Sequence, residues 1–121
     1  LKEELQEPVF IGEEDCSTLL IGWGSTYGPI KEAIANLNKS GDDKYGALVF
    51  GDIYPLPRKR LEEKAKNVTN IINVEQNATG QFAGLVRETT GITCTDSILK
   101  YDGRQITGEE IVDGILKGGS R

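Results

Sequence analysis

The most consequential absence in this 121-residue chain is histidine, which does not occur at all. Histidine is the side chain that most often moves protons in catalysis, and it is the usual activator of a nucleophilic Ser or Cys. Ser25 and Cys94 therefore have no partner with which to build a Ser or Cys triad. Glu75, a possible acid or base, likewise has no usual proton-transfer partner.

Cysteine is almost as scarce, because Cys16 and Cys94 are the only two and stand far apart. Neither lies in a metal-ligand spacing, and an iron–sulfur cluster would need about four such ligands. A chain of this length can bury a hydrophobic core without disulfide bonds. We therefore expect two free thiols, a cytoplasmic location, and no metal or cluster held by these residues.

The sequence also lacks a basic face and a long apolar run. Its net charge is -5, whereas a partner with a phosphate backbone would require clustered positive charge. No segment approaches the roughly 20 apolar residues of a membrane-spanning helix, and the amino terminus has no signal-peptide core. We expect neither a nucleic acid nor a membrane as a partner.

The length predicts one domain. The chain begins with Leu1 rather than Met, and an acidic stretch follows, so residues 1–7 are interpreted as a linker from an upstream domain. Residues 8–117 are expected to form a single α/β domain. The small and polar residues 118–121 are expected to form a flexible tail.

Apolar runs alternate with helical patterns along the chain. Strands are predicted at 18–21, 47–50, 71–74 and, more weakly, 98–99, with a further edge strand at 8–11. Helices follow the four main strands, with Pro29 and Pro57 expected at first helical positions. Gly91 is a stop signal, and Thr107–Glu110 has capping-box spacing. This alternation predicts a mostly parallel, doubly wound α/β sheet.

Polar side chains gather where the third main strand ends. Glu75, Gln76, Asn77 and Gln81 follow the apolar run at 71–74, at the end of a parallel strand where open α/β sheets place ligand and partner contacts. The alternative interpretation of Glu75 is structural, with its carboxylate held by backbone amides of the following turn.

Two strand-to-helix turns are candidate anion sites, because backbone N–H groups at a helix start attract phosphate or carboxylate. The glycine spacing at 22–28 is one residue longer than the dinucleotide fingerprint and is not a phosphate-binding loop of the Walker type. We favour a tight turn with a packed Trp23. The candidate anion-site residues are Gly24, Ser25, Thr26, Thr79 and Gly80.

Trp23, Tyr27 and Tyr54 all fall at or after the carboxyl ends of strands. Aromatic residues are enriched at interface centres, so these three would form a partner-facing patch if they are exposed together. If they are buried, they only cap the core. The sequence leaves both interpretations open.

Four motifs at 20–26, 52–57, 74–82 and 100–104 occur in an order that resembles a known family. The chain is similar to the carboxyl-terminal domain of the alpha subunit of 2-oxoacid:ferredoxin oxidoreductases, particularly the 2-oxoglutarate type. The resemblance implies a fold like the carboxyl-terminal domain of transketolase. That fold is a three-layer, five-stranded sheet with helices on both faces, mainly parallel with one antiparallel strand.

The resemblance also implies membership of an enzyme that decarboxylates a 2-oxoacid, transfers the acyl group to coenzyme A and reduces ferredoxin. Thiamine diphosphate, Mg²⁺, an iron–sulfur cluster and coenzyme A are implied for that full enzyme, and none for this domain. The magnesium motif of the family is Gly-Asp-Gly, and here Asp102-Gly103 is not preceded by Gly.

What the resemblance implies for this domain is docking against the remainder of the alpha subunit and the beta subunit, without a catalytic residue. Two other functions stay open: a module that binds an anionic ligand such as coenzyme A or phosphate, and the carboxyl-terminal domain of a transketolase or 2-oxoacid dehydrogenase. The interface candidates are Trp23, Tyr27, Tyr54, Glu75, Gln76, Asn77 and Gln81.

Overall fold

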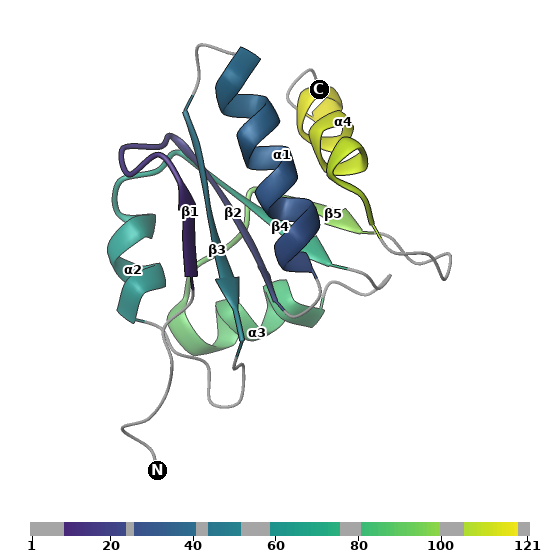
Figure 1. The fold of residues 1–121 in the computed structure, drawn as a ribbon. Coiled ribbons are helices and arrows are strands. Elements are labelled where there is room, and N and C mark those ends of the chain that lie inside the picture. The colour runs from purple at the N-terminus through teal and green to yellow at the C-terminus, as the bar shows by residue number, and fades with distance from the viewer. Residues whose placement is uncertain are drawn as a thin grey trace.

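The computed structural model describes residues 9–23, 26–40, 44–51, 59–75, 81–99 and 106–118. Strands and helices alternate along these residues after an initial pair of strands (Figure 1). In chain order the elements are β1 (Val9–Gly12), β2 (Thr18–Trp23), α1 (Tyr27–Ser40), β3 (Tyr45–Phe50), α2 (Lys59–Ala65), β4 (Asn70–Glu75), α3 (Gln81–Thr90), β5 (Asp96–Leu99) and α4 (Gly108–Gly118).

The strands form one five-stranded sheet in the order β1-β3-β2-β4-β5. β2 lies at the centre and runs parallel to both β3 and β4, and β4 runs parallel to β5. β1 is antiparallel to β3 and lies at the opposite edge from β5. Helices α1 and α4 cover one face, and α2 and α3 cover the other (Figure 1). The three-layer, mostly parallel fold with one antiparallel edge strand is confirmed.

The two faces of the sheet bury separate hydrophobic clusters, because side chains alternate between faces along each strand. Leu20 of β2 packs with Ile30 and Ile111 in the cluster beneath α1 and α4. Its neighbour Leu19 packs with Phe82 in the cluster beneath α2 and α3. Full burial of each such side chain contributes roughly 1.5–3 kcal/mol, so both layers of helices are needed to cover the sheet.

Two predicted helix boundaries are confirmed by their hydrogen bonds. The Thr107 backbone N–H donates to Glu110 Oε1 at 2.9 Å, and the Glu110 N–H donates to Thr107 Oγ1 at 3.2 Å, which together form the capping box of α4. Gly91 has φ +80° just after α3, and its N–H donates to the Arg87 carbonyl at 2.8 Å. That left-handed backbone ends α3 and favours glycine.

Other boundaries differ from the prediction. Pro29 is the third residue of α1 rather than the first, which the helix tolerates because N–H groups in its first turn have no intrahelical acceptor. The spacing of Leu61, Ala65 and Val68 predicts one apolar face of a helix, but Val68 lies beyond the end of α2, where it still packs against the core. Pro57 and the motif at 100–104 lie outside the described residues.

Candidate functional site

Glu75 ends β4 and is only 1% exposed. Its Oε2 oxygen accepts hydrogen bonds from Asn73 Nδ2 at 2.6 Å, from the Phe82 backbone N–H at 2.8 Å and from the Ala83 backbone N–H at 3.2 Å. The two amides belong to the first turn of α3 rather than to the turn before it. The carboxylate therefore lies beneath the helix and presents almost no surface to a partner.

The position of Glu75 follows from the chemistry of a helix start. The first N–H groups of a helix have no partner within it, and the aligned peptide dipoles favour negative charge there. Glu75 supplies that acceptor and charge from the preceding strand. Gln81 is the first residue of α3, and Gln76, Asn77, Thr79 and Gly80 lie outside the described residues.

Asn73 is the partner of Glu75 that sequence reasoning missed. It is 0% exposed and points to the same face of β4 as Glu75, because the two residues are two apart on a strand. Its Oδ1 oxygen has no hydrogen-bond partner among the described residues. Leaving a buried carbonyl unpaired costs about 1–3 kcal/mol. The available signal was an amide at an otherwise apolar strand position, on the face of a carboxylate.

Trp23 and Tyr27 flank the carboxyl end of β2 and are 39% and 41% exposed. The Trp23 ring lies 6.5 Å from the Phe82 ring, which in turn contacts Phe50 edge-on at 5.4 Å. Trp23 is thus anchored to the core and open to solvent. The Lys31 ammonium lies over the Tyr27 ring, 5.9 Å from the ring centroid. Both aromatic side chains are exposed, while Tyr54 lies outside the described residues.

The described part of the glycine-rich turn after β2 is closely packed. Thr26 is 3% exposed, and its hydroxyl donates to the Trp23 carbonyl at 3.0 Å. A Cβ at Gly22 would lie 2.6 Å from Ile30 Cδ1, so this glycine allows α1 to approach the strand. The Thr26 hydroxyl is therefore used within the protein. The other candidates in this turn, Gly24 and Ser25, lie outside the described residues.

Both cysteines are free thiols, as expected. Burial raises the pKa of the Cys94 thiol to about 11, and the Glu75 carboxylate adds to that rise. Burial also raises the pKa of Cys16. Both thiols are therefore protonated at neutral pH, and a protonated thiol is a poor nucleophile and a poor metal ligand.

Across the described ranges, no three His, Cys, Asp or Glu side chains gather as a metal-binding group. Within the same ranges, none of the helices combines the length and the apolar character needed to cross a bilayer.

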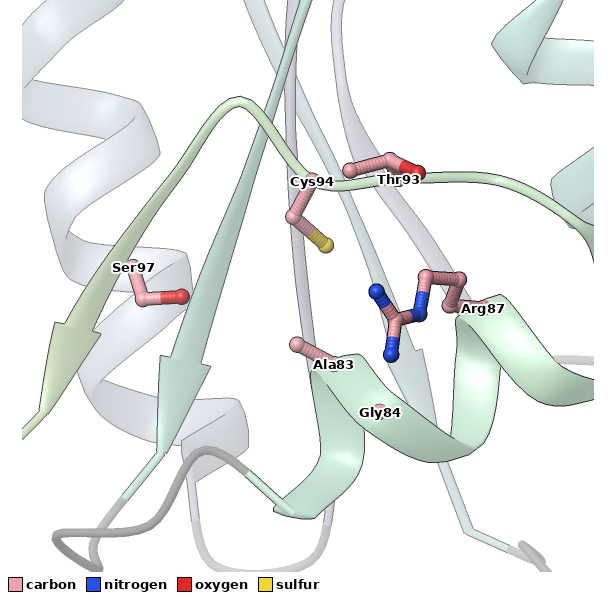
Figure 2. A pocket seen from close by; sticks show the side chains of 6 residues that line it. All are labelled: Ala83, Gly84, Arg87, Thr93, Cys94 and Ser97. Carbon is pink, nitrogen blue, oxygen red and sulfur yellow. The ribbon is translucent and has the colours of Figure 1, made fainter.

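A pocket of about 250 Å³ opens between α3 and the segment that leads into β5 (Figure 2). Sequence reasoning did not single it out, because its walls come from a helix and from the segment after that helix, which meet only when α3 packs on the sheet. The described residues that line it are Ala83, Gly84, Arg87, Thr93, Cys94 and Ser97.

Comparison with known proteins places this chain in one family. Residues 16–111 match the family described as pyruvate:ferredoxin oxidoreductase core domain II. The chain is 36% identical over 109 residues to 2-oxoacid:ferredoxin oxidoreductase 1, subunit alpha, of Aeropyrum pernix, covering 88% of the chain and 17% of that protein. The corresponding subunit of Saccharolobus solfataricus is 31% identical over 115 residues, which cover 95% of this chain and 18% of that subunit.

The solved structures that resemble the domain include the following two. A 2-oxoglutarate:ferredoxin oxidoreductase from Magnetococcus marinus, solved with 2-oxoglutarate, coenzyme A and succinyl-CoA bound, superposes with a TM-score of 0.86 at 25% identity, over 96% of this chain and 20% of that one. The alpha chain of a probable 2-oxoacid ferredoxin oxidoreductase from Thermoplasma acidophilum superposes with a TM-score of 0.64 at 30% identity. The match covers 95% of this chain and 98% of that one.

The chain spans less than a fifth of the length of the curated relatives, which match it at 17% and 18% of their own length. The family match nevertheless covers every described strand from β2 onward and reaches into α4. The chain therefore belongs to the pyruvate:ferredoxin oxidoreductase core domain II family, a domain that it shares with alpha subunits of 2-oxoacid:ferredoxin oxidoreductases.

Proposed function

We propose that the chain is a non-catalytic assembly domain in the alpha subunit of a 2-oxoacid:ferredoxin oxidoreductase. The complete enzyme would oxidatively decarboxylate a 2-oxoacid to an acyl-CoA and reduce ferredoxin, in the cytoplasm. The names of the curated relatives support the reaction class. The substrate proposed is 2-oxoglutarate, and its support is the structural likeness to the 2-oxoglutarate:ferredoxin oxidoreductase of Magnetococcus marinus.

The proposal of a non-catalytic role rests on one observation. Glu75 is the one buried carboxylate among the described residues, and it stabilises the start of α3. Its Oε2 oxygen is occupied by three donors from its own domain. With histidine absent from the sequence and both thiols protonated at neutral pH, the described residues offer no ready proton acceptor or nucleophile in the interior.

The cofactors of the reaction are proposed to bind elsewhere in the enzyme. The described residues provide no cluster of carboxylate, imidazole or thiolate ligands for Mg²⁺ or an iron–sulfur centre. We therefore assign thiamine diphosphate, Mg²⁺, the cluster and coenzyme A to the remainder of the alpha subunit and the beta subunit, with ferredoxin as the external partner.

The interface is proposed at the carboxyl edge of the sheet, where Trp23 and Tyr27 are exposed. Trp23 is held on one side by Phe82 and open on the other, so it presents a pre-positioned apolar surface. A rigid aromatic side chain of this kind contributes strongly to interfaces, because little conformational entropy is lost when it becomes buried.

The test is co-expression of the complete enzyme with Trp23→Ala or Tyr27→Ala. Leu116→Ala is the matched control, since Leu116 is 59% exposed near the far end of α4. We expect the two aromatic variants to reduce the yield of assembled enzyme on size exclusion, and the control to leave it unchanged. Equal assembly of all three variants would remove the interface from the proposal.

The catalytic and substrate parts have separate readouts. The 121-residue chain, supplied with 2-oxoglutarate, coenzyme A, thiamine diphosphate and Mg²⁺, is expected to reduce no viologen dye, and turnover by the chain alone would overturn its non-catalytic role. The complete enzyme is expected to show a higher kcat/KM for 2-oxoglutarate than for pyruvate. The opposite preference would overturn the substrate assignment.

A further inference from the structure

None of the described residues that line the pocket between α3 and β5 belongs to the proposed interface of Trp23 and Tyr27. The pocket has a volume of about 250 Å³. One wall is formed by Ala83, Gly84 and Arg87 on α3. The facing wall is formed by Thr93 and Cys94, which precede β5, and by Ser97 on that strand (Figure 2).

Arg87 gives this pocket its charge. Its guanidinium turns toward the pocket, beside Cys94 (Figure 2). Among the described residues it takes part in no ion pair and no side-chain hydrogen bond. An arginine that faces a concavity with no partner among the described residues is notable in a chain of net charge -5, where carboxylates are plentiful.

The opposite wall adds neutral hydrogen-bond donors. The hydroxyls of Thr93 and Ser97 line the pocket, and neither hydroxyl has a partner among the described residues. Cys94 keeps its proton at neutral pH, because burial raises its pKa to about 11, so the thiol does not cancel the arginine charge. The Glu75 carboxylate, which contributes to that rise, is directed at the amides of α3.

Gly84 keeps the pocket open. It lies in the interior of α3, where glycine costs about 0.5–1 kcal/mol relative to alanine. Packing within the domain does not require it, since a Cβ built at this position meets no atom within 4 Å. The missing side chain therefore leaves room beside the guanidinium without serving the packing of the domain.

We propose that this pocket binds a small anion through a carboxylate or phosphate group. The Arg87 guanidinium would take two oxygens of that group in its planar fork, and the Ser97 and Thr93 hydroxyls would donate to the remaining oxygens. The volume accommodates such a group with a short stem, and it lies just below the usual range for drug-sized ligands, about 300–1,000 Å³.

The test is a titration of the ¹⁵N-labelled 121-residue chain, followed by backbone amide NMR shifts. Inorganic phosphate is added in one arm and acetate in the other, both at constant ionic strength set with chloride. We expect saturable shifts confined to the amides of Gly84, Arg87, Thr93, Cys94 and Ser97. Saturation by phosphate alone would assign the phosphate class, and saturation by both anions would assign the shared anionic group.

Two variants tie the binding to this pocket. Arg87→Gln is expected to weaken binding at least tenfold, and Gly84→Leu is expected to abolish it by filling the space while keeping a good helix former in α3. Lys66→Gln removes the same charge from an exposed position after α2, and Gly28→Leu makes the same change at an exposed glycine of α1. Both control variants should bind as the unmodified chain does.

Two results would overturn the proposal. The first is the absence of saturable shifts with either anion, and the second is binding that survives Arg87→Gln and Gly84→Leu. If the first result is accompanied by weaker assembly of the complete enzyme in the Arg87→Gln variant, the pocket is assigned to an acidic side chain of neighbouring protein instead.

Discussion

The Oε2 oxygen of Glu75 accepts a 2.8 Å hydrogen bond from the backbone N–H of Phe82, which joins the end of β4 to the first turn of α3. The same turn carries the Phe82 ring that contacts Trp23 and Phe50. One buried carboxylate therefore positions both a helix and the aromatic side chain beneath the exposed Trp23. The hydrogen bonds of the Glu75 carboxylate therefore stabilise the fold.

Replacement of Glu75 should cost stability in a graded way. Glu75→Ala leaves the Phe82 and Ala83 amides without this acceptor and opens a cavity, and we expect a loss of about 3 kcal/mol in the free energy of unfolding. Glu75→Gln keeps a carbonyl acceptor but loses the charge, and should cost about 1–2 kcal/mol. Urea denaturation of the 121-residue chain measures both changes. Equal stability of Glu75→Ala and the unmodified chain would contradict the structural role.

Asn73→Asp tests the contact between Asn73 and Glu75, because it introduces a negative charge with almost no change in side-chain shape. The Asn73 amide donates to Glu75 Oε2 at 2.6 Å, and a carboxylate there would face another buried carboxylate. We expect a loss of roughly 3 kcal/mol or more at neutral pH. Urea denaturation of the unmodified chain and of the variant at neutral pH measures the loss, and equal stability of the two would argue against the contact.

Two glycines should respond to alanine with opposite signs. Gly12 has φ +104°, and a Cβ there would lie 2.5 Å from the Tyr45 carbonyl oxygen, so Gly12→Ala is expected to destabilise the domain by about 2 kcal/mol or more. Gly84→Ala meets no atom within 4 Å and should stabilise α3 by about 0.5–1 kcal/mol. Thermal unfolding of the two variants measures the direction of each change in stability. A Gly84→Ala chain that unfolds at a lower temperature would show that the position is packed.

The raised pKa of Cys94 predicts how stability depends on alkaline pH. The folded value of about 11 lies above the ordinary value of 9.0, so the neutral thiol favours the folded state below pH 9, and that contribution is lost as pH rises toward 11. The unmodified chain should therefore lose more stability over this interval than Cys94→Ala does. Urea midpoints across the interval measure the difference, because the variant retains all other titrating groups. Parallel curves for the two proteins would mean that the thiol is not buried as described.

The same burial predicts slow alkylation of Cys94 near neutral pH. The thiolate is the reactive form, and little of it is present well below the pKa. Iodoacetamide labelling followed by peptide mass spectrometry should give a rate well below that of the same peptide in the denatured chain. Comparable rates in the two states would contradict the prediction.

Much of the fold could be predicted because its signals are local. The run Leu19–Ile21 is apolar on both faces, as a central parallel strand requires, and the Thr107–Glu110 spacing encodes its own cap. The candidate site was less predictable. The position of Glu75 at the end of a strand was readable, but whether its carboxylate faces solvent or α3 depends on where the following helix packs.

The sequence by itself determined the order of strands and helices and excluded histidine-based catalysis, because periodicity, caps and composition depend on neighbouring residues or on none. Only the tertiary structure decided which distant groups meet. It brought Arg87, Cys94 and Ser97 around one pocket, and it placed Asn73 and Glu75 beneath α3. Such contacts depend on how a helix lies across a sheet, and that geometry is set by the packing of the whole core.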